Sequence, residues 1–444
     1  MIRNRTAFPD SVANRTALDC IEAGIEAAHP ERVVRDSVSV DGDVLTVGDE
    51  RHDLSAYERV VVVGGGNAAA QVAAVLESLL GPHLDGGVVV TDSPCETAVV
   101  DVLPADHPIP SERGVESTRA LLERADTFGS ETLVLAVLTG GGSACLVAPA
   151  AGIGLEELRE TTETLLAAGA PIEEINAVRK HLSEIKGGRL ADSLAPARVC
   201  ALVLSDVVGD DPSVVASGPL VPDGTTFSDA RAVLDSRDLA VPKAVRERVA
   251  AGKSGEHEET PGADDPAFDG VSTHIIGSNL TAVTAARDAA TRRGYDALVL
   301  STRIRGPARG AALSHVAVAE EMVATGNPIE PPAVVLSGGE TTVRVTGDGA
   351  GGPNQEFALA CAGDLPSETV MAAVDTDGID GNTDAAGALV DGGSVTDDDA
   401  AERALEANDS HAYLSSQGAL VRTGPTGTNV NDLRVLVVGT PDDP

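Results

Sequence analysis

Short apolar runs rich in valine, leucine and isoleucine recur along the chain, and amphipathic stretches separate many of them. The short runs predict buried strands, and apolar residues spaced three and four apart predict helices that cover a sheet. The predicted strands are residues 59–63, 87–91, 132–138, 199–204, 273–276, 297–301, 333–336, 370–374 and 433–438. The predicted helices are residues 67–80, 115–125, 155–168, 281–293 and 310–325. This alternation is typical of an α/β fold with Rossmann-like, mainly parallel sheets flanked by helices.

Residues 250–268 interrupt this alternation, because they are rich in Gly, Glu, Asp and Pro and contain few apolar residues. They predict an exposed linker or a disordered loop. We therefore expect an N-terminal Rossmann-like domain of residues 1–230, a connecting segment of residues 231–271 with this acidic linker, and a C-terminal α/β domain of residues 272–444. In open sheets ligands bind beyond the carboxyl ends of the strands, often where two domains face each other.

Glycine-rich turns follow four of the predicted strands. The first, GGGNAA at residues 64–69, fits a dinucleotide-binding turn, would hold any phosphate equally well, and is otherwise a tight turn without a ligand. The P-loop motif is absent, since the only Gly-Lys-Ser lies in the expected linker. Four such turns indicate a polyanionic ligand spread across a cleft. They comprise Gly65, Gly66 and Asn67; Gly140, Gly141, Gly142 and Ser143; Ser278 and Asn279; and Gly338, Gly339, Glu340 and Thr341.

Basic side chains gather in one stretch of a chain that contains few lysines. The stretch contains Arg179, Lys180, Lys186 and Arg189. Arg179, Lys186 and Arg189 recur at helical offsets, which would place several of them on one face. A solvated salt-bridge face is the plain interpretation. Binding of a phosphate or carboxylate is favoured, because lysine is otherwise so rare.

Carboxylates follow two of the predicted strands. Asp206 and Asp210 come after residues 199–204, and Asp377 comes after residues 370–374. Such carboxylates could hold Mg²⁺ or accept a hydroxyl proton, although any single Asp in so acidic a chain is more often solvated. Residues 423–432, which include Thr428 and Asn429, form a polar glycine-rich segment that predicts a further ligand-facing loop.

The formal charge is −37, from 69 acidic and 32 basic residues that are dispersed along the chain. Molar salt would screen this repulsion, so we expect a protein adapted to high salt. Nucleic acid and anionic membranes are excluded as partners, because the charge repels them. The five cysteines show no CxxC pair, which favours free thiols over disulfides or a zinc site. Without a signal peptide or a membrane span, a cytoplasmic location is expected.

Several long motifs resemble one known family. The runs LTGGGSACLVA at residue 138, INAVRKHLSEIKGGRLA at 175 and LSDVVGDDPSVVASGPLVPDGTT at 204 look like the N-terminal domain of glycerate 2-kinases. LSGGETTVRV at residue 336, GGPNQEFALA at 351 (which contains Asn354), TDGIDGNTDAAGALVDG at 376 and TGPTGTNVNDLRVLVVG at 423 resemble the C-terminal MOFRL domain of that family. The composition is that of a haloarchaeal member.

This resemblance implies transfer of the γ-phosphoryl group of ATP to the 2-hydroxyl of D-glycerate, with Mg²⁺ and an active site in the cleft between two domains. Whether two copies form a homodimer is left open. Family members usually carry a lysine in the first glycine turn, where this chain has Asn67. The missing charge is then expected from Arg179, Lys180 or Lys186, with Asp206 or Asp377 orienting Mg²⁺ or accepting the proton.

Two rival functions remain. An NAD(P)H-dependent hydroxypyruvate reductase would use the turn at residues 64–69 for its dinucleotide. A non-catalytic sensor of sugar acids or nucleotides would explain the loss of the lysine at Asn67.

Overall fold

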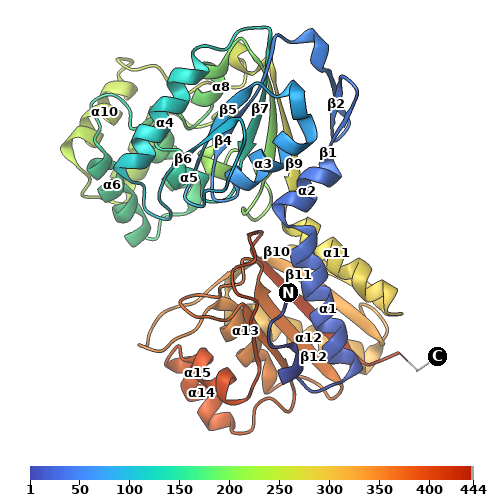
Figure 1. The fold of residues 1–444 in the computed structure, drawn as a ribbon. Helices are drawn as coiled ribbons and strands as arrows, with labels where there is room; N and C mark the ends of the chain where they lie inside the picture. The colour runs from blue at the N-terminus through green and yellow to red at the C-terminus, as the bar shows by residue number, and fades with distance from the viewer. Residues whose placement is uncertain (442–444) are drawn as a thin grey trace. The chain divides into compact units, whose positions relative to one another are not determined.

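The computed structural model describes residues 1–441, which form two compact units (Figure 1). The N-terminal unit is Val33–Ile276. The C-terminal unit combines Met1–Arg32 with the chain from Gly277 onward. These units divide the chain differently from the expected boundaries at residues 230 and 272. The first 32 residues pack with the C-terminal unit, because α1 (Val12–Ala27) buries its apolar face there.

The sheet of the N-terminal unit has six strands in the order β6-β5-β4-β7-β8-β9. Adjacent strands from β6 to β8 run parallel, as predicted. Counted along the chain, the order is the 3-2-1-4-5-6 of doubly wound folds, which bind ligands where the order reverses. Here that point lies between β4 and β7. The strands are β4 (Arg59–Gly65), β5 (Gly86–Thr91), β6 (Val100–Pro104), β7 (Thr132–Leu138), β8 (Arg198–Leu204) and β9 (Val271–Gly277).

Alternating residues of these strands feed two cores. Val60 and Val62 of β4 pack with α3 (Ala69–Leu80) on one face. Val61 and Val63 pack with α4 (Glu112–Ala125) and α8 (Arg189–Leu194) on the other. A separate helical cluster lies beside them (Figure 1). The remaining α-helices are α2 (Pro30–Ser37), α5 (Gly142–Cys145), α6 (Leu155–Ala167), α7 (Ile172–His181), α9 (Phe227–Ser236) and α10 (Lys243–Lys253).

A small antiparallel sheet covers part of the first face. Its strands are β1 (Val38–Asp41), β2 (Val44–Val47) and β3 (Glu50–Asp53). Val38, Leu45 and Val47 contribute to the same core as α3. The sequence pattern predicts no strand in this region.

The sheet of the C-terminal unit corrects the expectation of parallel strands. Its order is β10-β11-β15-β12-β13-β14, and only β10 and β11 pair in parallel. The last strand, β15, lies antiparallel to both β11 and β12, and β13 and β14 continue the antiparallel pairing. Strand periodicity does not encode direction, so the sequence could not show this. The strands are β10 (Asp296–Pro307), β11 (Ala333–Thr342), β12 (Thr369–Asp375), β13 (Gly387–Asp391), β14 (Leu420–Val421) and β15 (Asp432–Val438).

Helices cover both faces of this second sheet (Figure 1). Apolar residues of α1 and α11 fill the core on one face, and those of α12 and α13 fill the core on the other. None of the described helices is long and apolar enough to cross a membrane. The helices of this unit besides α1 are α11 (Asn279–Arg292), α12 (Ala308–Thr325), α13 (Pro353–Ala362), α14 (Asp398–Glu406) and α15 (Ser410–Ser416).

Residues 250–268 are neither a linker between the units nor disordered. They begin in α10 and lie wholly within the N-terminal unit. The Thr260 hydroxyl donates a 2.9 Å hydrogen bond to buried Asp223, and Glu259 lies 3.1 Å from the imidazole of His181. The segment is largely exposed, as its composition predicts, but polar contacts hold it to the N-terminal unit.

Candidate active site

Two of the predicted glycine turns interlock at the point where the strand order of the N-terminal sheet reverses. The backbone N–H of Asn67 donates to the carbonyl of Gly140 at 2.8 Å, and the Thr139 hydroxyl accepts from the N–H of Ala68 at 3.2 Å. Gly141 has φ +74°, and a Cβ there would overlap the side-chain oxygen of Asn67. The structure thus brings Gly65, Gly66 and Asn67 together with the turn of residues 140–143, and Asn67 occupies the space over Gly141.

A hydrogen-bonded cluster of polar side chains lies beside this turn. The Ser143 and Ser217 hydroxyls are 2.8 Å apart, and Ser217 donates to the Asn176 side-chain oxygen at 3.1 Å. Arg179 reaches the same Asn176 oxygen at 3.4 Å and the Ser217 hydroxyl at 3.5 Å. Ser217 has φ +64°, which is strained for a residue with a side chain and is characteristic of functional loops.

Lys186 forms hydrogen bonds to backbone carbonyls of the second glycine turn and the helix that follows it. Its ammonium donates to the carbonyls of Ser143 and Leu146, both at 2.8 Å. Burial, together with the nearby charge of Arg179, lowers the pKa of Lys186 to about 7. Burial also lowers the pKa of Arg179. The structure therefore brings two of the predicted cations, Lys186 and Arg179, to the turn.

Asp206 follows β8 and lies against Gly140, where a Cβ would overlap its carboxylate. Burial raises the pKa of Asp206, whereas the neighbouring charge of His107 and the N–H of Gly141 lower it. Asp210 lies in the turn that follows, with φ +58° and its N–H bonded to the carbonyl of Val207. Asp206 is thus the carboxylate that the structure places at the glycine turn.

The other two predicted cations have different partners. Buried Lys180 pairs with Asp223 at 3.1 Å, and Arg189 donates to the backbone carbonyls of Glu258 and Glu259 at 3.3 and 3.4 Å. The expectation that several of Arg179, Lys186 and Arg189 share one helix face is wrong. Helix α7 ends at His181 and α8 begins at Arg189, so Lys186 lies in the turn between them.

The C-terminal unit has its own polar cluster at the ends of β11 and β12. The Asn279 amide donates to the carbonyls of Val430 and Asp432 at 2.7 and 2.8 Å and packs against Gly338. The Thr341 N–H donates to the Asp432 carboxylate at 2.9 Å. Buried Arg434 binds the same carboxylate and stacks on Phe357 at 4.7 Å. Nearby, Ser278 precedes α11, Gly339 has φ +126°, and Glu340 is exposed at the edge.

Three more carboxylates lie near Asp432. Burial raises the pKa of Asp375, with the charges of Asp377 and Asp432 acting in the same direction, and burial also raises the pKa of Asp377. Burial raises the pKa of Asp380 to about 6, although Asn354 and its neighbour donate hydrogen bonds to it. Asn354 also donates to Asp432 at 2.6 Å. These buried carboxylates repel one another and favour a proton or a cation among them.

The polar loop before β15 is anchored to the N-terminal helix. The Thr428 hydroxyl donates to the carbonyl of Ala28 at 2.6 Å, and the Asn429 side chain accepts from the N–H of Asn431 at 2.9 Å. Both predicted residues thus make contacts within their own unit.

Several residues of these clusters escape prediction from sequence. Ser217 lies far along the chain from Ser143, and Arg434 lies far from Thr341, so their contacts cannot be read from the sequence. Both stand inside motifs of the family resemblance, but nothing in those motifs singles them out. Asn176 lies in the basic stretch, three residues before Arg179, but an asparagine at that position does not by itself predict a binding residue. Asp432 ends the polar segment of residues 423–432, which predicts a ligand-facing loop but not the part this carboxylate plays.

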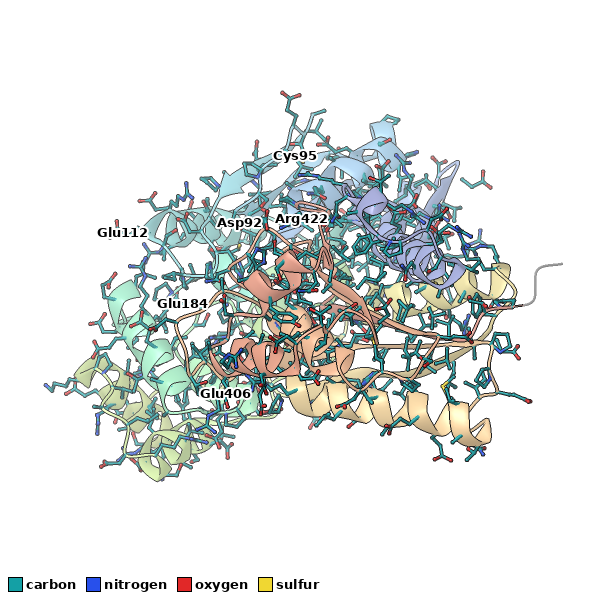
Figure 2. The ribbon with its side chains drawn as sticks, turned by 90° about the horizontal axis from the view of Figure 1, so that it is seen from below. Asp92, Cys95, Glu112, Glu184, Glu406 and Arg422 are labelled. Atoms are coloured by element: carbon teal, nitrogen blue, oxygen red, sulfur yellow. The ribbon has the colours of Figure 1, made fainter. Side chains whose placement is uncertain are left out.

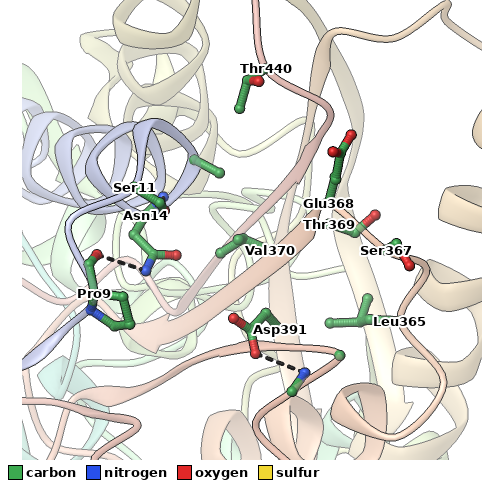
Figure 3. Close-up of a pocket in the computed structure, with 13 residues that line it drawn as sticks. Pro9, Ser11, Asn14, Leu365, Ser367, Glu368, Thr369, Val370, Asp391 and Thr440 are labelled. Carbon is green, nitrogen blue, oxygen red and sulfur yellow. Dashed lines mark hydrogen bonds between the residues drawn. The ribbon is translucent and has the colours of Figure 1, made fainter.

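A pocket of about 490 Å³ lies elsewhere in the C-terminal unit (Figure 3). Asn14, Thr369 and Asp391 line it. Thr369 begins β12, whereas Asp375 and Asp377 lie at its other end. This pocket is therefore separate from the carboxylate cluster.

The doubly wound sheet, with interlocked glycine turns, two cations and a carboxylate at its switch point, defines an α/β protein suited to binding a phosphorylated or carboxylated small molecule. Comparison with known proteins gives its family. Residues 16–250 match the family described as a domain of unknown function (DUF4147), and residues 333–432 match the MOFRL family.

The chain is 38% identical over 95% of its length to the glycerate 2-kinase of Pyrococcus horikoshii, of which the match covers 96%. A crystal structure of glycerate kinase from Thermotoga maritima superimposes with a TM-score of 0.85 at 36% identity, covering 97% of this chain and all of that one. A protein of Agrobacterium vitis, named provisionally as a hydroxypyruvate reductase, is 40% identical over 86% of this chain and 87% of its own. The chain belongs to the DUF4147–MOFRL family that includes these glycerate kinases.

Proposed function

We propose that this protein is a glycerate 2-kinase, which transfers the γ-phosphoryl group of ATP to the 2-hydroxyl of D-glycerate. One observation carries the proposal: the likeness to the Pyrococcus horikoshii glycerate 2-kinase extends over nearly the whole of both chains. The cluster at the switch point supports it, since phosphoryl transfer requires mainly positioning and neutralisation of charge.

In this proposal the turn of residues 140–143 offers backbone N–H groups to a phosphate or to the substrate carboxylate. Arg179 uses one terminal nitrogen for Asn176 and Ser217, which leaves other N–H groups of its guanidinium for an anion. Lys186 acts indirectly, because it holds the carbonyls of Ser143 and Leu146 and so fixes the turn. Asn67 does not supply the positive charge of the lysine found in relatives, so Arg179 takes that role.

We propose Asp206 as the group that accepts the hydroxyl proton or holds Mg²⁺. Its carboxylate lies against the glycine turn, and its burial favours proton uptake. An oxygen ligand of this kind suits Mg²⁺, which would neutralise charge on the transferred phosphoryl group. Asp377, with its pKa also raised, is the corresponding candidate in the C-terminal unit.

A coupled assay tests the proposal. Purified protein is incubated with D-glycerate, ATP and Mg²⁺ in molar KCl, and the product is offered to enolase, which consumes 2-phosphoglycerate. We expect ADP formation with a product that enolase removes. Formation of the 3-phosphate, or nucleotide binding without any ADP, would overturn the assignment, and the latter would favour a sensor.

A second function has specific support. Asp92 follows β5, where dinucleotide enzymes place the acid that binds the ribose, and its Oδ1 is buried without a hydrogen-bond partner. The relative from Agrobacterium vitis carries the matching provisional name. The ribose of ATP would satisfy the same oxygen. Loss of NADH absorbance on adding hydroxypyruvate would establish a reductase, and a flat trace would leave Asp92 to the ribose of ATP.

We also propose that the protein works in molar salt within a reducing, cytoplasmic compartment. Exposed acids such as Glu112, Glu184 and Glu406 project from both units (Figure 2), in keeping with a net charge of −37. All five cysteines are free, and only Cys95 is exposed.

A further inference from the structure

Three potential metal ligands converge where the small sheet meets an edge of the large one. Glu50 of β3, Cys200 of β8 and His274 of β9 each offer a donor atom, and these three atoms lie within 4.8 Å of one another. Among residues 1–441, no other group of three His, Cys, Asp or Glu side chains meets this criterion. None of these three residues belongs to the cluster at the glycine turns, so this group is separate from the candidate active site.

A fourth side chain, that of His52, lies beside the group. His52 lies two residues after Glu50 on β3, so both side chains emerge on the same face of the strand. The Nε2 atom of His52 lies 3.4 Å from a Glu50 oxygen, yet it is buried and has no hydrogen-bond partner. The residue as a whole is only 4% exposed. Buried polar atoms nearly always have a partner, so the unpaired nitrogen points to a ligand.

We propose that Glu50, His52, Cys200 and His274 form a structural zinc site. Two imidazoles, one thiolate and one carboxylate are the donors that four-coordinate Zn²⁺ binds. At Zn–N and Zn–S bond lengths of about 2.0 and 2.3 Å, tetrahedral ligand atoms lie about 3.3–3.5 Å apart. The donor atoms of Glu50, Cys200 and His274 lie within 4.8 Å of one another, and His52, which is 3.4 Å from Glu50 but outside that group of three, has to turn toward the ion. Binding breaks the S–H bond of Cys200, and its proton passes to solvent as the Zn–S bond forms.

The contacts of Glu50 show how the ion would be accommodated. One carboxylate oxygen lies 2.9 Å from Nε2 of His274, and the other accepts from Arg198 at 2.6 Å. Arg198 is 38% exposed along its side chain, so it can keep or leave Glu50 at little cost. If Arg198 stays, it orients the carboxylate as partners of metal ligands commonly do.

The site has a structural consequence. Its ligands come from the small sheet and from two strands of the large sheet, so the ion would fasten β3 to β8 and β9. No CxxC motif announces such a site, because the four ligands are scattered along more than half of the chain. The expectation of free thiols rather than a zinc site would then fail at Cys200 alone.

The test uses the full chain without a histidine tag, stripped by chelation and kept in molar KCl to suppress binding by surface acids. Zn²⁺ or Co²⁺ is added, excess is removed, and bound metal is counted by mass spectrometry. We expect one ion per chain, a thiolate-to-Co²⁺ charge-transfer band, and a rise in Tm of about 5–10 °C at hundredfold excess of Zn²⁺ over Kd.

Variants assign the ligands. Cys200→Ser should abolish the charge-transfer band, and His52→Gln should keep the band but weaken binding at least tenfold. His52→Gln removes a nitrogen that has no partner, so the protein should fold even if Cys200→Ser does not. Cys361→Ser, a buried cysteine of the C-terminal unit, is the matched control and should bind as the parent does. Absence of stoichiometric metal in the parent, a band that survives Cys200→Ser, or unchanged affinity in His52→Gln would overturn the proposal.

Discussion

Replacing Lys186 with Met should change stability in a way that depends on pH. The substitution keeps the length of the side chain but leaves the carbonyls of Ser143 and Leu146 without their donor. Each unpaired buried carbonyl costs about 1–3 kcal/mol. At pH 9, where the folded protein holds Lys186 uncharged and hydrogen-bonded, we therefore expect the N-terminal unit to lose about 2–6 kcal/mol for the two carbonyls together.

The sign of the pH effect follows from the lowered pKa. The folded-state pKa of Lys186 is about 7, against an ordinary value of 10.5, so the unfolded chain binds more protons between these pH values. Stability of the parent therefore rises with pH across this window and falls as pH drops toward 7. Two pH units at about 1.4 kcal/mol each, less the half-titration at pH 7, give a loss of about 2 kcal/mol between pH 9 and pH 7.

Lys186→Met has no such group, so the stability gap between parent and variant should shrink by about 2 kcal/mol from pH 9 to pH 7. Urea unfolding at constant KCl, followed by circular dichroism, measures the gap in the transition of the N-terminal unit. Lys243→Met is the control, because Lys243 is 86% exposed in its side chain and should give the same small gap at both pH values. A gap for Lys186→Met that does not change with pH would refute the reasoning.

Three further predictions address the candidate site and the charge. Asp206→Asn should lower kcat by about 10²–10⁴ if this carboxylate accepts the proton; steady-state kinetics measure this, and an unchanged kcat would remove Asp206 from the chemistry. Gly141→Ala should reduce activity because its Cβ overlaps Asn67, and the double variant Gly141→Ala/Asn67→Ala should recover part of it, leaving about 1 kcal/mol of strain from the φ of +74°; no recovery would show that Asn67 is not the obstruction. Raising KCl should increase the Tm, since the net charge of −37 is screened; highest stability without salt would contradict adaptation to molar salt.

Local patterning was enough to predict the elements that build the candidate site. The run at residues 132–138 coincides with β7, and two of the predicted glycine turns fall at the ends of β4 and β7. These features are legible because a parallel strand buried on both faces needs a continuous apolar run, and a turn against backbone needs glycine. The turn predicted at residues 338–341 is wrong, because Gly338 and Gly339 lie within β11 and pair with its neighbouring strands.

Other features depend on contacts between distant parts of the chain and could not be predicted. Strand β15 pairs antiparallel with β12, and the hydrophobic pattern of a strand does not indicate the direction in which it pairs. The hydroxyl of Ser217 gains its role only because a strained loop carries it to Ser143. Lys180 likewise pairs with buried Asp223, although the rarity of lysine in this chain predicts that it binds a ligand.

Helix α1 has a consequence for the order in which the protein matures on the ribosome. Its residues Leu18, Ile21 and Ile25 are fully buried against partners that include Leu433, near the end of the chain. The N-terminal unit is contiguous and complete once residue 276 emerges, so it can fold while α1 still lacks its binding surface. Translation of the following stretch to β15 takes roughly 10–30 s at ordinary rates. During that interval the apolar face of α1 has no surface to pack against, which makes this helix a candidate substrate for a chaperone.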